Sequence, residues 1–220
     1  MLIFLRTLVI TIALYFWYYT QSLLSHRTLP AQEATSVSSI HDEVHSLTSG
    51  LHARISRSTK LTNVLLATSS ATMDLLALFL LTIAIFGPTF APAVGLILLL
   101  SLRQLAQSFC RLPLPIGIIW RNPGISSIFV TYEVKNDLFF SGHTAFSVYG
   151  ALIVRSMLGN CVGIPLGLFL VSFQITVVLL LRVHYTMDVF TGVFCALYIY
   201  HINGVISPYV DEFFFMISHT

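Results

Sequence analysis

Charged side chains are scarce in this sequence of 220 residues. Asp, Glu, Lys and Arg together make up 9% of the chain, whereas a soluble domain carries about a quarter. Hydrophobic residues make up 56%, and the mean hydropathy is +0.85. So few charges cannot coat a water-soluble globule, because its surface would not be polar enough. The sequence therefore predicts a membrane protein, much of whose surface is in contact with lipid.

Cysteine pairs and dense basic blocks are also lacking. The three cysteines, Cys110, Cys161 and Cys195, lie far apart in or beside apolar runs, with no CxxC pair and no Cys/His ligand spacing. We therefore expect no disulfide framework, no metal site and no cofactor, and we interpret all three as small buried hydrophobes. The net charge of +2 comes without a basic block, so nucleic acid is not expected as a partner.

Six apolar runs follow one another along the chain, and each is close to the roughly 20 residues that cross a bilayer as a helix. They cover about residues 1–24, 61–86, 91–109, 138–157, 164–181 and 189–206. The first run is aromatic at 15–19 and has no clear small-residue cleavage site, so a retained span is favoured over a signal peptide. The runs predict an all-α fold, a polytopic membrane helical bundle of about six transmembrane helices.

A long polar stretch lies between the first two runs, at residues 25–60. Within it, apolar residues recur at steps of three and four, which predicts a helix with one apolar stripe. The stripe consists of Ile40, Val44, Leu47, Leu51 and Ile55, and the other face carries Asp42, Glu43, His45, His52, Arg54 and Arg57. Either this helix lies on the membrane surface or its stripe packs on the bundle. We divide the chain into an N-terminal span with this partly amphipathic segment (1–60), a membrane domain (61–210) and a short tail (211–220).

Two polar clusters interrupt the later apolar runs. The first is Ser141-Gly142-His143-Thr144, which opens the fourth run, and the second is Arg182-Val183-His184-Tyr185-Thr186-Met187-Asp188, which joins the fifth to the sixth. Ionisable groups within apolar sequence are costly, so each is a functional candidate. Because the fourth span begins on the membrane face where the fifth ends, we expect His143 and His184 to meet on that face.

The spacing of His184 and Asp188 favours nucleophilic chemistry. Residues four apart share one face of a helix, so the carboxylate can bind one imidazole nitrogen. That contact fixes the tautomer and raises the basicity of the other nitrogen, which makes His184 a nucleophile suited to phosphorus. A second histidine, His143, is then placed to protonate the leaving alkoxide.

A phosphate would also need donors and positive charge. Ser141 and Gly142 stand where a helix starts, and the free backbone N–H groups of a helix start suit a phosphate. Arg182 lies two residues before His184, and Lys135 precedes the fourth span. We expect such cations to neutralise phosphoryl oxygens.

A metal centre is the rival interpretation of His143, His184 and Asp188, because these residue types also bind metals. The sequence has no HxxH clusters, and its acidic and basic groups are too few for a di-iron site, which favours the metal-free interpretation. The remaining histidines lie in polar segments or near the ends, and we interpret them as solvated. They are His26, His41, His45, His52, His201 and His219.

Asp74 stands apart, in the middle of the second run with no other charge nearby. A carboxylate inside an apolar run is a candidate for function because burying it is costly. It is predicted either to contact the substrate head group or to pair with a basic residue of another span, with a purely structural role close behind.

The two clusters resemble the motifs of the lipid phosphatase and phosphotransferase superfamily, which includes the type-2 phosphatidic acid phosphatases. The closer resemblance is to the sphingomyelin synthase branch and to phosphatidylcholine:diacylglycerol cholinephosphotransferases. It rests on Asp137-Leu138-Phe139-Phe140-Ser141-Gly142-His143-Thr144, on His184-Tyr185-Thr186-Met187-Asp188, and on Cys110-Arg111-Leu112-Pro113-Leu114-Pro115 preceded by Arg103. It spans roughly Arg103 to Gly192, and the N-terminal half matches only as membrane spans.

The resemblance implies a six-span bundle with a catalytic triad of His143, His184 and Asp188. It implies a phosphohistidine-type intermediate at His184 with no metal required, and it adds Arg103 and Asp137 to the expected substrate-binding residues. A head group such as phosphocholine would leave a phospholipid donor and pass to the hydroxyl of a diacylglycerol or ceramide acceptor.

Two departures separate the chain from the phosphatases of that superfamily. Their Lys-then-Arg-Pro motif is not matched at Arg103 to Pro113, and their Arg lies well upstream of the second His, whereas Arg182 is two residues before His184. Both departures favour the transferase branch. A lipid phosphate phosphatase is the alternative, and a non-catalytic membrane transporter or scaffold is a weaker one.

Two signals in the sequence conflict about which side of the membrane holds the site. Placing both histidines outside puts most Lys and Arg outside as well, against the positive-inside rule. Members of the resembling family usually face the lumen or the exterior, and active-site cations are placed for phosphate. We therefore expect a multi-pass protein of an endomembrane or the plasma membrane with a lumenal or exoplasmic site.

Overall fold

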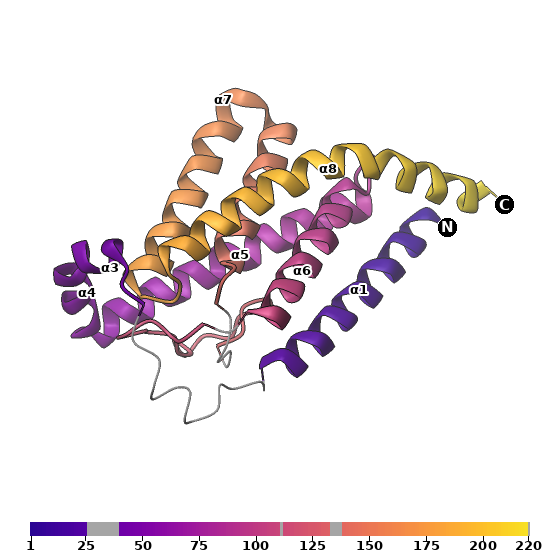
Figure 1. Cartoon of the computed structure of the whole chain (residues 1–220). Coiled ribbons are helices and arrows are strands. Elements are labelled where there is room, and N and C mark those ends of the chain that lie inside the picture. Colours follow the sequence, from indigo (N-terminus) through magenta and orange to yellow (C-terminus); the bar gives the residue numbers. More distant parts are fainter. Residues whose placement is uncertain (26–39, 111, 133–137, 220) are drawn as a thin grey trace.

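The computed structural model describes residues 1–25, 40–110, 112–132 and 138–219, and the regular structure there is entirely helical (Figure 1). The helices are α1 (Leu2–Ser25), α3 (Glu43–Leu47), α4 (Ser49–Ser56), α5 (Thr59–Phe86), α6 (Ala91–Phe109), α7 (Gly142–Leu180) and α8 (Thr186–His219). Within these described ranges, five helices are long and apolar enough to cross a membrane, namely α1, α5, α6, α7 and α8. The predicted all-α, polytopic helical bundle is confirmed.

The longest helix, α7, consists of two arms that turn at Gly159. Gly159 has φ +74°, a left-handed conformation that glycine adopts at little cost. The arms fold back on each other, since a Cβ added at Gly163 would lie 2.4 Å from the Cα of Arg155. Figure 1 shows the two arms side by side, with the turn far from both ends of the helix. They correspond to the fourth and fifth predicted runs. With α7 counted as two arms, the five long apolar helices of the described residues give six long segments, where about six spans were predicted.

Both ends of α7 lie next to the start of α8. The backbone N–H of Ser141 donates to the carbonyl oxygen of Asp188 (3.1 Å), which joins the two helix starts. A Cβ added at Gly192 would lie 2.8 Å from the carbonyl oxygen of Ser141, so a glycine is needed for this close approach. The predicted meeting of the two polar clusters at one end of the bundle follows from this packing.

The bundle core forms around Tyr149, which is fully buried among α5, α6, α7 and α8. Its hydroxyl donates to the carbonyl oxygen of Ala91 (3.1 Å) and accepts from Nδ2 of Asn203 (3.1 Å). A Cβ at Gly95 would lie 2.0 Å from that hydroxyl, so glycine allows α6 to approach α7 here. These contacts bind α7 to the first turns of α6 and to α8.

Residues 40–60 differ from the predicted amphipathic helix. They form two short helices, α3 and α4, and Leu47 of the predicted stripe is 84% exposed. The prediction that His45 and His52 are solvated was wrong, since both are buried. His52 Nδ1 donates to the carbonyl oxygen of Leu180 (2.8 Å), and His45 Nε2 donates to that of His184 (3.1 Å). The carbonyl of Leu180, at the end of α7, needs a donor from outside the helix, and His52 supplies it. The carbonyl of His184 lies in the turn before α8, and His45 donates to it.

The C-terminal residues continue the last helix. The sequence placed the end of the sixth span near residue 206 and a short tail after 210, whereas α8 runs on to His219 with Pro208 inside it. Asp211 explains the extension, because its carboxylate accepts hydrogen bonds from the backbone N–H of Phe90 (2.7 Å) and from the Thr89 hydroxyl. It also lies 3.5 Å from Nη2 of Arg6. The end of α8 is thus bound to α1 and to the turn between α5 and α6.

Candidate active site

The buried pair of His184 and Asp188 is the centre of the candidate site. His184 Nδ1 lies 3.1 Å from Asp188 Oδ2, and each side chain is 2% exposed. The same carboxylate oxygen accepts from the backbone N–H of Tyr185 (3.1 Å). Asp188 stands in the first turn of α8, where the helix dipole favours a negative charge. With Nδ1–H donating to the carboxylate, Nε2 of His184 is left as a lone-pair nitrogen.

His143 lies beside this pair at the start of α7. It lines a small cavity together with His184, Trp120 and Leu138. The Trp120 ring meets its imidazole edge-on, with centroids 5.3 Å apart. Nε2 of His143 is buried and has no hydrogen-bond partner among the described residues. A buried polar atom in this state is suited to exchange a proton with a ligand in the cavity.

The start of α7 offers backbone donors next to a buried cation. The Ser141 hydroxyl accepts from the backbone N–H of Thr144 (3.3 Å) and so caps the helix. The side chain that was predicted to contact the substrate thus makes a hydrogen bond within the protein. Gly142 and His143 occupy the first two helical positions, whose N–H groups have no acceptor within the helix. A Cβ at Gly142 would lie 2.7 Å from Nε of Arg103, so the guanidinium lies against this helix start.

Arg103 itself is 7% exposed and is held by α1. Its Nη1 donates to Oε1 of Gln21 (3.2 Å). A buried guanidinium next to two first-turn amides forms an electropositive region of the kind that binds phosphate. The predicted substrate-binding role of Arg103 therefore has a geometric basis and stays a prediction.

Arg182 binds backbone groups. It adopts φ +54°, its Nη1 donates to the carbonyl oxygen of Ile116 (2.8 Å), and its Nη2 donates to that of His45 (3.3 Å). The side chain thereby joins the connection 112–132 to α3 directly beside His184. Its predicted contact with phosphate stays a prediction.

Asp74 anchors the same connection. Its carboxylate accepts from the Ser127 hydroxyl (2.8 Å) and from the backbone N–H groups of Ile128 (3.1 Å) and Phe129 (3.0 Å). Irregular backbone packed beside a membrane-spanning helix needs acceptors for its N–H groups. Of the three roles considered for Asp74, these contacts favour the structural one. Of the remaining predicted binding residues, Lys135 and Asp137 lie outside the described residues.

Two residues whose role sequence reasoning missed hold the turn that carries His184. Asp42 caps α3 by accepting from the N–H of Val44 (3.0 Å), and its other oxygen accepts from the N–H of Thr186 (2.7 Å), the first residue of α8. Burial raises the pKa of Asp42, but the hydrogen bonds from Thr186 and His45 outweigh burial and hold that pKa below its ordinary value. His45 stacks on Tyr185 with ring centroids 5.9 Å apart. An Asp before a short helix signals a cap, but nothing local signals its second partner.

The connection 112–132 covers the site. Tyr185 donates its hydroxyl to the carbonyl oxygen of Pro113 (3.0 Å), and Trp120 Nε1 donates to that of Thr131 (3.3 Å). Tyr132 stacks obliquely on Trp120 (centroids 4.8 Å apart), and its hydroxyl contacts that of Ser70 on α5. The segment that carries Trp120 is thus fixed over His143 at both of its ends.

Comparison with known proteins identifies the family of this bundle. The family model AtPDCT1/2 matches residues 41–205, about three quarters of the chain. The match includes His143, His184 and Asp188, and it begins just before Asp42. Neither the curated proteins nor the solved structures gave a match. The chain therefore belongs to the AtPDCT1/2 family of phosphatidylcholine:diacylglycerol cholinephosphotransferases, and it is a membrane protein that transfers lipid head groups.

Proposed function

We propose that the protein transfers phosphocholine from phosphatidylcholine to the hydroxyl of diacylglycerol through a phosphohistidine at His184. The observation that carries this proposal is the buried His184–Asp188 pair (3.1 Å), which shares one cavity with the unpartnered Nε2 of His143. The proposed nucleophile, its orienting carboxylate and the histidine proposed to carry the proton would thus act in one place.

In the first half-reaction, Nε2 of His184 attacks the phosphorus of the donor lipid. The P–N bond forms while the bond from phosphorus to the glycerol oxygen breaks. His143 gives a proton to that oxygen, so diacylglycerol leaves as a neutral alcohol. Asp188 stabilises the positive charge that develops on the His184 ring.

In the second half-reaction, the hydroxyl of an acceptor diacylglycerol attacks the same phosphorus from the side that the first alcohol left. His143 takes the hydroxyl proton, the P–N bond breaks, and His184 returns to its starting form. In both steps the phosphoryl oxygens gain negative charge, which Arg103 and the first amides of α7 are placed to stabilise.

Transfer rather than hydrolysis is favoured by what surrounds His143. Trp120 lies against the imidazole, and the cavity that leads away from His143 has predominantly apolar walls. Water is a poor competitor in such surroundings, whereas a lipid hydroxyl arrives from the membrane. A phosphatase of the same superfamily would need an open path for water to the phosphohistidine.

The acceptor and the sidedness are finer parts of the proposal. Diacylglycerol is preferred over ceramide because the family match is to the phosphatidylcholine:diacylglycerol cholinephosphotransferases, whereas the sphingomyelin synthase resemblance rests on shared motifs. We place the site on the lumenal or exoplasmic face of an endomembrane or the plasma membrane.

The test uses purified protein in liposomes of choline-labelled phosphatidylcholine with fluorescent diacylglycerol or fluorescent ceramide. The expected product is fluorescent phosphatidylcholine, and the His184→Ala protein should make none. Fluorescent sphingomyelin in equal amounts would overturn the acceptor assignment. Free phosphocholine as the main product, without lipid transfer, would establish the hydrolytic alternative.

A further inference from the structure

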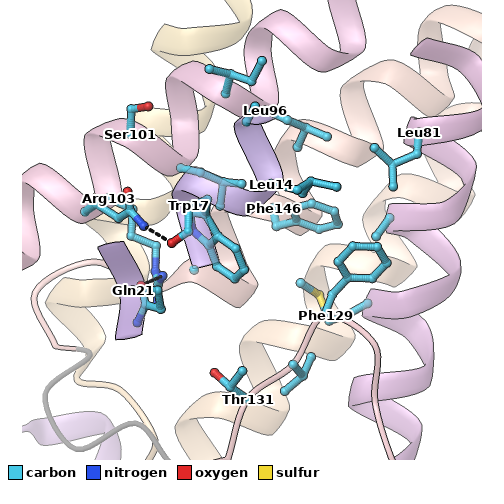
Figure 2. A pocket seen from close by; sticks show the side chains of 18 of the residues that line it. Leu14, Trp17, Gln21, Leu81, Leu96, Ser101, Arg103, Phe129, Thr131 and Phe146 are labelled. Atoms are coloured by element: carbon cyan, nitrogen blue, oxygen red, sulfur yellow. Dashed lines mark hydrogen bonds between the residues drawn. The ribbon is translucent and has the colours of Figure 1, made fainter. Parts of the chain in front are cut away.

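A larger cavity of about 200 Å³ shares His143 and Trp120 with the small catalytic cavity. Its walls come from α1, α5, α6, the start of α7 and residues 129–131. Most of its lining is apolar, as Figure 2 shows for Leu14, Leu81, Leu96, Phe129 and Phe146. An apolar cavity that reaches a catalytic imidazole is suited to an apolar part of the substrate.

Several polar groups of this cavity, Gln21, Ser101 and Arg103, lie on one side of it. In Figure 2, Arg103 and Gln21 lie on one side and Leu81 and Phe129 on the opposite side. Trp17, between them, has a buried Nε1 without a hydrogen-bond partner among the described residues. A buried donor left unpaired costs free energy, and an acceptor such as an ester carbonyl would remove that cost. The cavity therefore complements an amphiphile with one polar end and long apolar chains.

The first helix completes this cavity. α1 contributes six lining residues, which are Ile10, Ala13, Leu14, Phe16, Trp17 and Gln21. Gln21 holds Arg103 (3.2 Å), and Gln104 Nε2 on α6 donates to the carbonyl oxygen of Trp17 (2.8 Å). Yet α1 lies outside residues 41–205, the part of the chain that the family model matches. The family match therefore does not explain why α1 is bound here.

We propose that this cavity binds an acyl chain of the diacylglycerol moiety, and that α1 sets which chains fit. The inference rests on the proposed function in one respect. The leaving glycerol oxygen and the attacking hydroxyl must occupy the same place opposite His184, beside His143. The chains attached to either oxygen therefore extend into the same cavity, which serves the donor first and the acceptor afterwards.

The selectivity test compares Leu14→Trp, which fills the cavity, with Leu8→Trp on the exposed face of the same helix. Each protein receives an equal mixture of dioctanoylglycerol and dioleoylglycerol as acceptors. Leu14→Trp should raise the ratio of short-chain to long-chain product by about fivefold or more, because the longer chain loses apolar contacts. Leu8→Trp should match the wild type. An equal ratio in all three proteins would overturn the inference.

A second measurement needs no turnover. The His184→Ala protein is irradiated in liposomes with phosphatidylcholine that carries a diazirine in its acyl chain, and labelled residues are mapped by mass spectrometry. The inference expects label on Leu96 and Phe146 that disappears when Leu14→Trp is added, while label on lipid-facing residues such as Leu8 persists. Label that ignores Leu14→Trp would overturn it.

These arms separate the two proposals. A wild-type protein without transfer activity would overturn the proposed function, and the labelling pattern would still decide the inference. If Leu14→Trp does not fold, Leu14→Ala replaces it in the selectivity test and should shift the product ratio toward longer chains. Trp17→Phe removes the indole donor and keeps a smaller aromatic ring. It should weaken the preference for ester-linked over ether-linked diradylglycerol, whereas an unchanged preference would count against the lipid occupant.

Discussion

The imidazole of His45 donates its Nε2–H to the backbone carbonyl oxygen of His184 (3.1 Å). His184 is the residue whose side chain is the nucleophile in the proposed reaction. The two residues are 139 positions apart. His45 also stacks on Tyr185, and the neighbouring Asp42 binds the N–H and hydroxyl of Thr186 (2.7 and 2.9 Å). The short helix α3 therefore positions the turn that presents His184.

This contact predicts that acid destabilises the packing of α3 against the turn that carries His184. Burial lowers the pKa of His45. Asp42 and the hydrogen bond to the His184 carbonyl oppose this shift, Arg182 and His52 add to it, and the net pKa lies below the ordinary value. The unfolded chain, with a pKa of about 6.5, therefore binds a proton at His45 before the folded protein does. The stability that neutral His45 contributes is present above pH 7. It should be lost as the pH falls below about 6.5, the pKa of His45 in the unfolded chain. The neutral donor in His45→Gln should retain the hydrogen bond and reduce this loss.

The measurement is the thermal midpoint of the detergent-solubilised protein between pH 7.5 and 5.5, together with transfer activity at pH 7.5. His45→Gln should lose fewer degrees on acidification than the wild type and keep most of its activity at pH 7.5, whereas His45→Ala should lose activity at that pH. Parallel pH curves for wild type and His45→Gln would show that His45 does not titrate in this window.

Asp188→Asn should lower the turnover rate by on the order of a thousandfold or more, because the amide cannot fix the His184 tautomer or stabilise the ring cation. Binding of phosphatidylcholine should change little, since Asp188 lies behind the histidine. Steady-state transfer assays over a range of donor concentrations distinguish the two effects. A loss of less than tenfold in kcat would contradict the role given to the pair.

Gly142→Ala should impair transfer by displacing Arg103, since the added Cβ would lie 2.7 Å from Nε of that guanidinium. The matched control is Gly204→Ala on α8, where an added Cβ meets nothing within 4 Å. We expect at least a tenfold loss in kcat/KM for the first variant and wild-type values for the second. Equal activity in both would argue against a phosphate site between Arg103 and the start of α7.

Trp120→Ala should raise the ratio of free phosphocholine to transferred lipid several-fold, because removing the ring opens His143 to water. Ile125→Ala changes an exposed side chain of the same connection and should leave the ratio alone. The ratio is read from a choline-labelled donor after separating lipid from water-soluble products. A ratio that stays constant while activity is retained would rule out Trp120 as the barrier to water.

The convergence of the candidate catalytic residues could be predicted because it depends on the order of the apolar runs. Once residues 138–181 form two spans joined by a turn at Gly159, the start of the first span and the end of the second lie on one face of the membrane. The i, i+4 spacing predicted a contact between the Asp188 carboxylate and the His184 imidazole, and the two lie 3.1 Å apart. His184, however, stands in the turn before α8 begins at Thr186, so the contact forms across the helix start and not along one helix face.

The contacts of the polar segment could not be predicted in this way. Periodicity favoured the stripe that includes Leu47, yet Leu47 is exposed and His45 and His52 are buried. What decides their positions is the need of the Leu180 and His184 carbonyl groups for donors, and those carbonyls lie more than a hundred residues away. The same holds for Asp74, which accepts from the Ser127 hydroxyl and from two backbone N–H groups of the connection 112–132. It also holds for Arg182, which donates to the carbonyl oxygens of Ile116 and His45. No side-chain pattern reveals these partners.

The most direct test of the mechanism is to trap the intermediate. The protein is mixed with phosphatidylcholine labelled at phosphorus, quenched in alkali, and digested for mass spectrometry. We expect a single labelled residue, His184, whose label is absent in His184→Gln and is discharged by added diacylglycerol as fast as the enzyme turns over. Label on His143, or steady transfer with no labelled histidine, would contradict the phosphohistidine at His184.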